Sequence, residues 1–276
     1  MCLIEISELK ELFMIVQLKK VLCGCLIFLC VFSFSFAADE LVFNSNKVDI
    51  HYTDTEGEGV PIVLLHGYTM SLDMWHETGI VDSLSKNYRV ITLDLRGHGK
   101  SGKPTNSHDY GPKVGIDVIN LLDHLKIPKS HLMGYSMGAF VVGRLLVTHP
   151  ERILSATLVS GSFPLSNEEE ADFQESTAKD MEAHGNKALA SVARGWAFDS
   201  ITVEQISNIL TPIQAVFGSE EVGDFYYAQQ KMLRKPKNSR PILLIEGADH
   251  DSKKAAVLHP KFLNEAKKFI SSIQKN

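Results

Sequence analysis

Cysteine is missing from the chain after position 30. The four cysteines of the sequence all lie before that point, at Cys2, Cys23, Cys25 and Cys30. The rest of the chain therefore cannot form a disulfide bond, a thiolate zinc site or a cysteine nucleophile. It does not need covalent cross-links, because a single domain of about 240 residues can bury a large hydrophobic core.

Basic patches, internal repeats and low-complexity segments are missing too. The formal net charge is -5 at pH 7, and no group of lysines and arginines is interleaved with aromatic residues. This balance argues against nucleic acid as a partner. The charged clusters at 168–170 and 253–254 are interpreted as solvated faces.

A long apolar run occurs near the N-terminus, at residues 21–36, and it is interpreted as part of an export signal. A pair of lysines precedes the run, and Ala37, Ala38 and two acidic residues follow it. This order of basic, apolar and small residues is typical of a secretory signal peptide. We predict that residues 1–38 are removed and that the protein is secreted or periplasmic. An uncleaved membrane anchor is the alternative, since the run is only slightly shorter than the roughly 20 apolar residues that span a bilayer.

Short apolar runs alternate with helical patterns from about residue 41 to the end, which is typical of an α/β fold. The first two runs, 41–43 and 48–52, flank Asn44-Ser45-Asn46 and predict a hairpin at an antiparallel edge. Six later runs predict buried parallel strands, at residues 62–65, 90–93, 131–133, 154–159, 213–217 and 242–245. Apolar residues recur at helical spacing within 114–125 and 262–273. Residues 39–276 are thus predicted to form one domain, a mostly parallel sheet of about eight strands with helices on both faces.

Residues 163–210 break this alternation. They are acidic at their start, contain Trp196 and Phe198, and predict helices without a strand. Ligands bind above the carboxyl ends of the strands in such sheets, so we predict that this segment is a small helical cap over the substrate pocket. A surface excursion without a binding role is the alternative.

The pentapeptide Gly-Tyr-Ser-Met-Gly at 134–138 lies between a short buried strand and a helical run of apolar residues. A strand, a sharp turn and a helix are the context that an activated serine requires. Small flanking residues allow the strand and the helix to approach each other, and Gly134 and Gly138 supply them. Ser136 is therefore the predicted nucleophile.

A serine hydroxyl is a weak nucleophile until an imidazole accepts its proton, and the imidazole in turn needs a carboxylate that orients it. His250 follows the last predicted strand directly, at the same sheet edge as Ser136, and is the predicted general base. The loop after the strand at 213–217 contains Glu220, Glu221 and Asp224. We predict that Glu221 is the acid, in the chain order serine, acid, histidine. Asp224 is the alternative if the loop is longer, and Glu220 is interpreted as facing solvent.

Two backbone N–H groups are predicted to stabilise the oxyanion of the tetrahedral intermediate. Met137 directly follows the nucleophile, and Tyr68 follows His66-Gly67 at the end of an earlier strand. Their amides can therefore converge on one point, where negative charge develops in a site with little water. Their side chains are interpreted as lining the pocket.

Four motifs occur in the order found in the α/β-hydrolase superfamily. They are His66-Gly67, Asp-Leu-Arg-Gly-His-Gly-Lys-Ser at 94–101, the pentapeptide at 134–138, and Gly-Ala-Asp-His at 247–250. The chain resembles the single-domain esterase, lactonase and haloperoxidase-like branch. That resemblance covers nearly all of the chain after the predicted signal peptide. It implies that Ser136 is the nucleophile, His250 the base, and the Tyr68 and Met137 amides the oxyanion hole.

In this family the acid usually stands three residues after the glycine that ends the penultimate strand, which is the position of Glu221. An aspartate is commoner there. Asp94, Arg96 and His98 could be taken for a second catalytic cluster or a metal site, but the resemblance implies a structural role for them. Relatives that hydrolyse haloalkanes or epoxides have aspartate at the nucleophile position, so Ser136 disfavours those reactions.

The resemblance implies a serine hydrolase that cleaves a small carboxylic ester or lactone through an acyl-enzyme. Its expected partner is a small-molecule substrate, and we expect no cofactor and no metal. Two alternatives remain within enzymes, cleavage of a carbon–carbon bond next to a carbonyl and perhydrolysis. A ligand-binding protein that keeps the fold without catalysis is the alternative outside enzymes.

Overall fold

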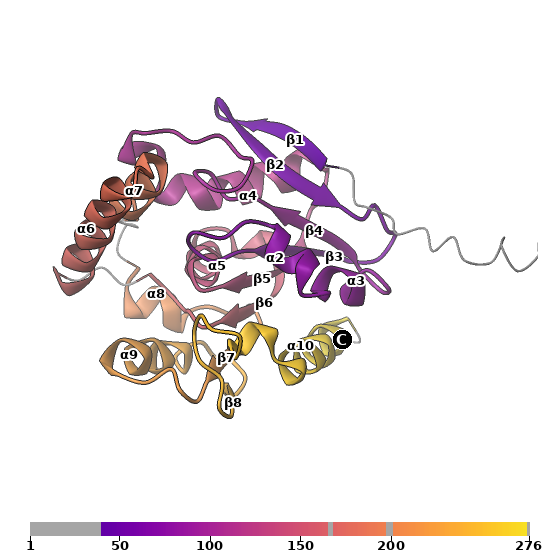
Figure 1. Cartoon of the computed structure of the whole chain (residues 1–276). Helices are drawn as coiled ribbons and strands as arrows, with labels where there is room; N and C mark the ends of the chain where they lie inside the picture. The colour runs from indigo at the N-terminus through magenta and orange to yellow at the C-terminus, as the bar shows by residue number, and fades with distance from the viewer. Residues whose placement is uncertain (1–39, 165–167, 197–200, 275–276) are drawn as a thin grey trace, which may run out of the picture. The chain divides into compact units, whose positions relative to one another are not determined.

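The computed structural model describes residues 40–164, 168–196 and 201–274. The predicted signal peptide at residues 1–38 lies outside these ranges. Within them an eight-stranded sheet has the order β1-β2-β4-β3-β5-β6-β7-β8. Figure 1 shows the sheet running through the centre of the view with helices around it. The strands are β1 (Glu40–Ser45), β2 (Val48–Asp54), β3 (Pro61–Leu65), β4 (Arg89–Leu93), β5 (Ser130–Tyr135), β6 (Ile153–Val159), β7 (Ile213–Gly218) and β8 (Leu243–Ile245).

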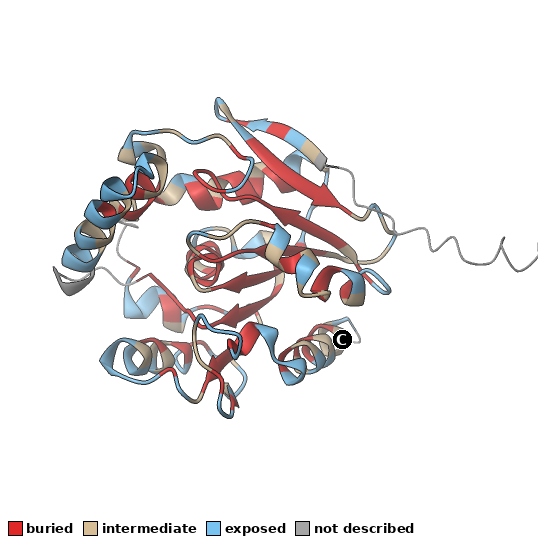
Figure 2. Cartoon of the chain, viewed as in Figure 1, coloured by how far each residue is buried: buried red, intermediate tan, exposed pale blue. Residues whose placement is uncertain are grey.

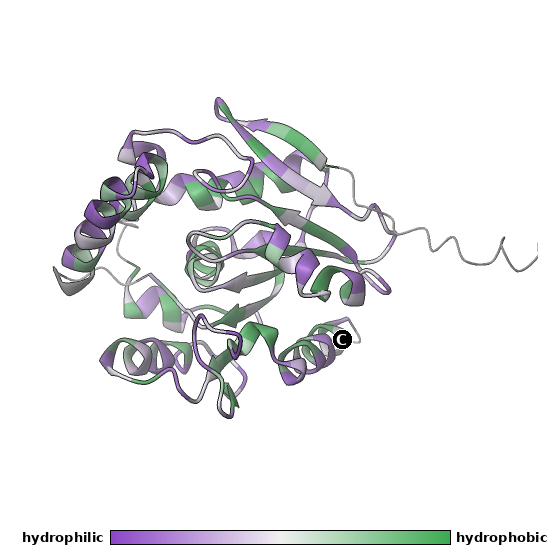
Figure 3. Ribbon diagram, in the orientation of Figure 1, coloured by the Kyte–Doolittle hydropathy of each residue, from purple (hydrophilic) through white to green (hydrophobic). Residues whose placement is uncertain are grey.

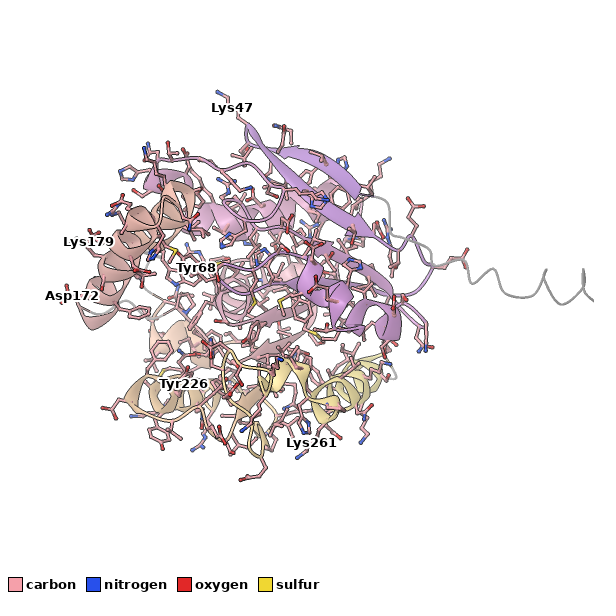
Figure 4. The ribbon with its side chains drawn as sticks, viewed as in Figure 1. Lys47, Tyr68, Asp172, Lys179, Tyr226 and Lys261 are labelled. Carbon is pink, nitrogen blue, oxygen red and sulfur yellow. The ribbon has the colours of Figure 1, made fainter. Side chains whose placement is uncertain are left out.

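The first two strands form the antiparallel edge. β1 pairs antiparallel with β2, β2 pairs antiparallel with β4, and all later neighbours pair parallel. The hairpin turn lies at Asn46 and Lys47, whose φ angles are 51° and 72°. This is slightly later than predicted, because β1 continues through Ser45 and the two-residue turn needs positive φ at both positions. Lys47 marks the tip of the hairpin in Figure 4.

Helices cover both faces of the sheet, as predicted for this fold class. Ile62 and Leu64 on β3 belong to the hydrophobic cluster that contains α2, α3 and α10, whereas Val63 and Leu65 belong to the cluster that contains α4 and α5. Successive strand residues point to opposite faces, so a continuous apolar strand requires two cores. Figure 2 shows the buried strands between these layers. The helices are α2 (Asp73–Glu77), α3 (Ile80–Leu84), α4 (Pro112–His124), α5 (Met137–Thr148) and α10 (Pro260–Ile273).

Three helices lie in the described part of the segment between β6 and β7, which we call the insertion. They are α6 (Glu168–Ala183), α7 (Lys187–Arg194) and α8 (Val203–Ser207), and the described part of this segment contains no strand. Arg194 forms ion pairs with Glu175 and Glu182, which tie α7 to α6. The hydroxyl of Ser191 on α7 donates to the Thr105 carbonyl at 2.7 Å. Whether residues 163–210 act as a cap remains a prediction.

Three short helices were not predicted from the sequence, namely α2, α3 and α9 (Asp224–Leu233). α2 and α3 have five residues each, which is too short for a helical period to stand out. α9 buries Gln229 and Leu233, and most of its other residues are polar or exposed. Purple and green alternate along α9 in Figure 3, whereas the central strands are mainly green. Among the residues described, none of the helices is long and apolar enough to cross a membrane.

Candidate active site

Ser136 lies in a strained turn between β5 and α5. Its φ is 50° and its ψ is -114°, a conformation that a residue with a side chain rarely adopts. The turn is possible because the two flanking glycines leave no room for a side chain. A Cβ on Gly134 would lie 2.3 Å from the Gly138 carbonyl carbon, and a Cβ on Gly138 would lie 2.2 Å from the Leu65 oxygen. The predicted strand, turn and helix are therefore present around this serine.

The side chains of Ser136, His250 and Glu221 lie next to one another. Ser136 Oγ is 3.0 Å from His250 Nε2, and His250 Nδ1 is 3.3 Å from a carboxylate oxygen of Glu221. The Glu221 side chain is fully buried, while that of His250 is 30% exposed. The second Glu221 oxygen accepts from the Gly218 amide at 3.3 Å. The structure thus brings together the three side chains that the sequence analysis named.

The other two carboxylates of this loop lie elsewhere. Glu220 is exposed, and Asp224 is an exposed residue in the first turn of α9. Neither forms an ion pair with His250 within the described part of the chain. Only Glu221 therefore has the position of a carboxylate that could orient the imidazole.

The loops that follow β7 and β8, which carry the acid and the histidine, approach each other closely. A Cβ on Gly218 would lie 2.2 Å from the Ala248 carbonyl oxygen, so a larger residue at 218 would push the two loops apart. The Glu220 amide donates to the same Ala248 oxygen at 2.9 Å. This contact sets the spacing between Glu221 and His250.

Two tyrosines hold His250 in place, and sequence reasoning did not identify this role. The Tyr135 hydroxyl donates to the His250 carbonyl, and its ring stacks on the imidazole with centroids 5.8 Å apart. The Tyr226 ring lies 5.9 Å from the imidazole, tilted by 50°. Burial and the nearby Glu221 raise the pKa of both phenols, so both remain protonated at neutral pH. The sequence shows Tyr135 as a member of the pentapeptide, but it does not show that the partner of its hydroxyl is the His250 carbonyl.

The predicted oxyanion donors lie on neighbouring segments, Met137 in the elbow and Tyr68 in the loop after β3. Leu65 at the end of β3 pairs with Gly134 on β5, so the loop that follows β3 and carries Tyr68 adjoins the turn that carries Met137. Among the described residues, neither the Tyr68 amide nor the Met137 amide donates to a backbone or side-chain acceptor. Both N–H groups can therefore donate a hydrogen bond to a ligand oxygen.

His66 fixes the loop that carries the Tyr68 amide. Burial lowers the pKa of His66, so the ring stays neutral. Its Nδ1 donates to the Gly67 carbonyl at 2.8 Å, and its Nε2 accepts from the Leu95 amide at 3.0 Å. The Tyr68 hydroxyl donates to the Leu189 carbonyl on α7 at 2.8 Å, which connects this loop to the insertion.

Asp94 has the structural role that the family resemblance implied. Its carboxylate accepts from the Leu72 amide at 2.8 Å, from the Lys100 amide at 2.7 Å and from His51 Nδ1 at 2.8 Å. Burial raises the pKa of Asp94, but these hydrogen bonds outweigh it and the pKa is lowered. Asp94 therefore holds three segments of chain together as an anion.

Arg96 and His98 lie beside it and are also buried. The Arg96 guanidinium pairs with Asp117 on α4, and both side chains are at most 2% exposed. Burial lowers the pKa of His98 to about 3, so it carries no charge at neutral pH. Within the residues described, no group of three or more histidine, aspartate, glutamate or cysteine side chains could hold a metal ion.

Comparison with known proteins agrees with this architecture. A family model described as "alpha/beta hydrolase fold" matches residues 60–242. The chain is 39% identical over 118 residues to a putative non-heme chloroperoxidase from Synechocystis sp. (strain ATCC 27184 / PCC 6803 / Kazusa), which covers 42% of each chain. It is 37% identical over 106 residues to a pimeloyl-[acyl-carrier protein] methyl ester esterase from Aeromonas hydrophila, covering 38% of this chain and 39% of the esterase. These matches span about two fifths of the length of both relatives.

Two solved structures share the fold at low sequence identity. A carboxylesterase from Nitrososphaera gargenis matches with a TM-score of 0.72 and 18% identity, over 86% of this chain and 99% of that one. The enol-lactonase from Burkholderia xenovorans LB400 matches with a TM-score of 0.65 and 20% identity, over 86% of this chain and 100% of that one. The family model covers more than half of the sequence, and the sheet order and the elbow agree with it. The chain therefore belongs to the α/β-hydrolase fold family.

Proposed function

We propose that this protein is a serine hydrolase that cleaves a small carboxylic ester or lactone through an acyl-enzyme intermediate. One observation carries the proposal: Ser136 Oγ lies 3.0 Å from His250 Nε2, within reach for proton transfer. Relatives named as an esterase and as an enol-lactonase favour the ester and lactone classes.

The first half of the reaction forms the acyl-enzyme. Ser136 Oγ attacks the carbonyl carbon while its proton passes to His250 Nε2. The charge on the carbonyl oxygen is stabilised by the Tyr68 and Met137 amides, and Glu221 stabilises the imidazolium. The bond between the carbonyl carbon and the alcohol oxygen then breaks, and the proton on His250 moves to that oxygen.

Water completes the cycle by the same route. His250 takes a proton from water as the water oxygen attacks the acyl carbon. When the bond between this carbon and Ser136 breaks, the proton on the imidazole returns to the serine oxygen. The products are a carboxylic acid, an alcohol and the free enzyme.

A fluorophosphonate probe tests the nucleophile, because it reacts covalently with activated serines. We expect the full chain to be labelled and the Ser136→Ala variant to remain unlabelled. Absent labelling of the natural sequence, or labelling that persists in the variant, would refute the proposal and favour a ligand-binding protein. A panel of p-nitrophenyl esters and lactones, with and without peroxide, then separates ester hydrolysis from perhydrolysis.

We also propose that the protein is exported, on the basis of the basic, apolar and small-residue order in residues 1–38. N-terminal sequencing of protein recovered outside the cytoplasm should begin after Ala37 or Ala38. An N-terminus that retains the apolar run would favour a membrane anchor instead.

A further inference from the structure

Four aromatic side chains form a continuous series of ring contacts that begins at His250. The Tyr226 ring lies 5.9 Å from the imidazole, and the Phe225 ring lies 5.3 Å from that of Tyr226. Phe140 follows at 6.4 Å from Phe225, and Trp196 lies 6.1 Å from Phe140. These separations are typical of aromatic rings in contact. We name Phe140, Trp196, Phe225 and Tyr226 the aromatic cluster.

The cluster is assembled from three segments that are far apart in the sequence. Phe140 lies in the first turns of α5, one helical turn after Ser136. Trp196 lies two residues after the end of α7, and Phe225 and Tyr226 lie in the first turn of α9. The cluster therefore connects α5, the residues after α7, and α9 near Ser136 and His250. It is not explained by the packing of any single helix.

The cluster is not a closed core. Phe225 is 54% exposed, and the other three members are partly exposed. Apolar surface in water is unfavourable by about 25 cal/mol per Å², so the exposed Phe225 ring, which only Tyr226 separates from His250 in the series, gains free energy when a ligand covers it. Trp196 and Tyr226 also pack against the main core, whereas more than half of Phe225 stays exposed, so Phe225 is the member with surface left for a ligand.

The sheet order shows which part of a substrate the cluster faces. Tyr68 follows β3 on one side of β5, whereas α9 and His250 follow β7 and β8 on the other side. Figure 4 labels Tyr68 near the insertion and Tyr226 on α9. The carbonyl oxygen turns toward the Tyr68 amide, while the leaving oxygen must face His250 to receive its proton. The cluster begins on the His250 side.

We propose that the aromatic cluster binds the alcohol portion of the substrate and selects esters whose alcohol carries an aromatic or bulky apolar group. This inference rests on the proposed function. The site has a distinct side for the alcohol portion only if His250 protonates the leaving oxygen of an ester. It assigns specificity to Phe225, an exposed residue without a role in the transfer of protons.

Two isomeric substrates provide the test. Benzyl acetate and methyl phenylacetate have the same atoms, but the ring is on the alcohol in the first and on the acyl group in the second. We expect Phe225→Ala to lower the ratio of kcat/KM for benzyl acetate to that for methyl phenylacetate roughly tenfold. Tyr227→Ala is the matched control, because Tyr227 is 58% exposed on the same helix and makes no ring contact with the described members of the cluster. Its ratio should equal that of the natural sequence.

The opposite outcomes overturn the inference. An equal loss for both isomers would mean that Phe225 only supports the fold, and a selective loss for methyl phenylacetate would place the cluster on the acyl side. Thermal melting of each variant shows whether a loss of activity reflects unfolding.

Fluorescence separates failure of this inference from failure of the proposed function. The sequence has two tryptophans, and Trp75 is fully buried, so a response to ligand reports on Trp196. We expect benzyl alcohol to change the emission of Ser136→Ala saturably, and the double variant with Phe225→Ala to respond at least several-fold more weakly. A protein that hydrolyses neither isomer but shows this response refutes the hydrolase proposal alone. If the emission is unchanged, the cluster does not bind aromatic groups.

Discussion

Replacing Gly138 with alanine should disable the proposed active site while it leaves every catalytic side chain in place. The added Cβ would lie 2.2 Å from the Leu65 oxygen and 2.6 Å from the Leu65 carbonyl carbon. Ordinary van der Waals contact begins at 3.4 Å, so the two segments must separate by about 1.2 Å (3.4 minus 2.2). The atoms that clash are backbone atoms, which cannot rotate away as a flexible side chain would.

This separation acts on the two proposed oxyanion donors. Gly138 follows Met137 in the first turn of α5, and Leu65 ends β3 three residues before Tyr68. Moving α5 from β3 therefore moves one amide away from the other. Loss of one oxyanion donor costs about 3 kcal/mol, and a misplacement of ~1 Å can reduce a rate ~100-fold. We expect kcat to fall by at least ~100-fold.

The assay is steady-state hydrolysis of p-nitrophenyl acetate, with thermal melting measured on the same samples. Gly115→Ala on α4 is the control, because its Cβ would meet first the Leu145 side-chain terminus, at 3.3 Å, and this group can move. That variant should keep the kcat of the natural sequence. If Gly138→Ala retains kcat within about threefold while Gly115→Ala does the same, the close approach at Leu65 does not set the oxyanion geometry.

Two further predictions concern the acid and the response to pH. Glu221→Gln should lower kcat ~10³–10⁴-fold, because an amide cannot stabilise the imidazolium. Asp224→Asn should change kcat less than about twofold. The reverse pattern would assign the acid to Asp224. Burial lowers the pKa of His131 to about 4, from an ordinary value of 6.5, and the only hydrogen-bond partner of its ring among the described residues is the Ser155 hydroxyl. The unfolded chain therefore binds more protons below about pH 6.5, and the free energy of unfolding should fall by about 2 kcal/mol between pH 7 and pH 5 from this residue. Urea unfolding at both pH values should show a smaller fall for His131→Asn, and an unchanged fall would contradict the assignment.

Local patterns were enough to predict the sheet and the elbow. Every strand has a short apolar run, and all eight lie within about two residues of their predicted positions. The turn at Ser136 was predictable because two glycines bracket a serine between a strand and a helix, and both glycines prove to lack space for a side chain. The short helices α2 and α3 and the polar helix α9 lack a distinct helical period of apolar residues, and they were not predicted.

Local sequence patterns were not sufficient to show which carboxylate contacts His250. Glu220, Glu221 and Asp224 all follow the strand at 213–217, and Glu221 was predicted as the acid while Asp224 stayed open as the alternative. In the structure only Glu221 is buried against the imidazole, because the loop turns at Gly218 against the Ala248 carbonyl. That contact joins two loops that are distant in the chain.

The fold class, the position of the strained serine and the histidine after the last strand could all be predicted from local patterns, because these features depend on hydrophobic period and turn chemistry within a few residues. The folded chain was needed to establish that Glu221, the predicted acid, meets His250, to identify the two tyrosines that contact this histidine and to reveal the aromatic cluster. These contacts depend on the register of β7 with β8, where Gly218 pairs with Ile245, and on the positions of the first turns of α5 and α9 and of the C-terminal end of α7. Such contacts form between segments tens of residues apart, and no local pattern encodes them.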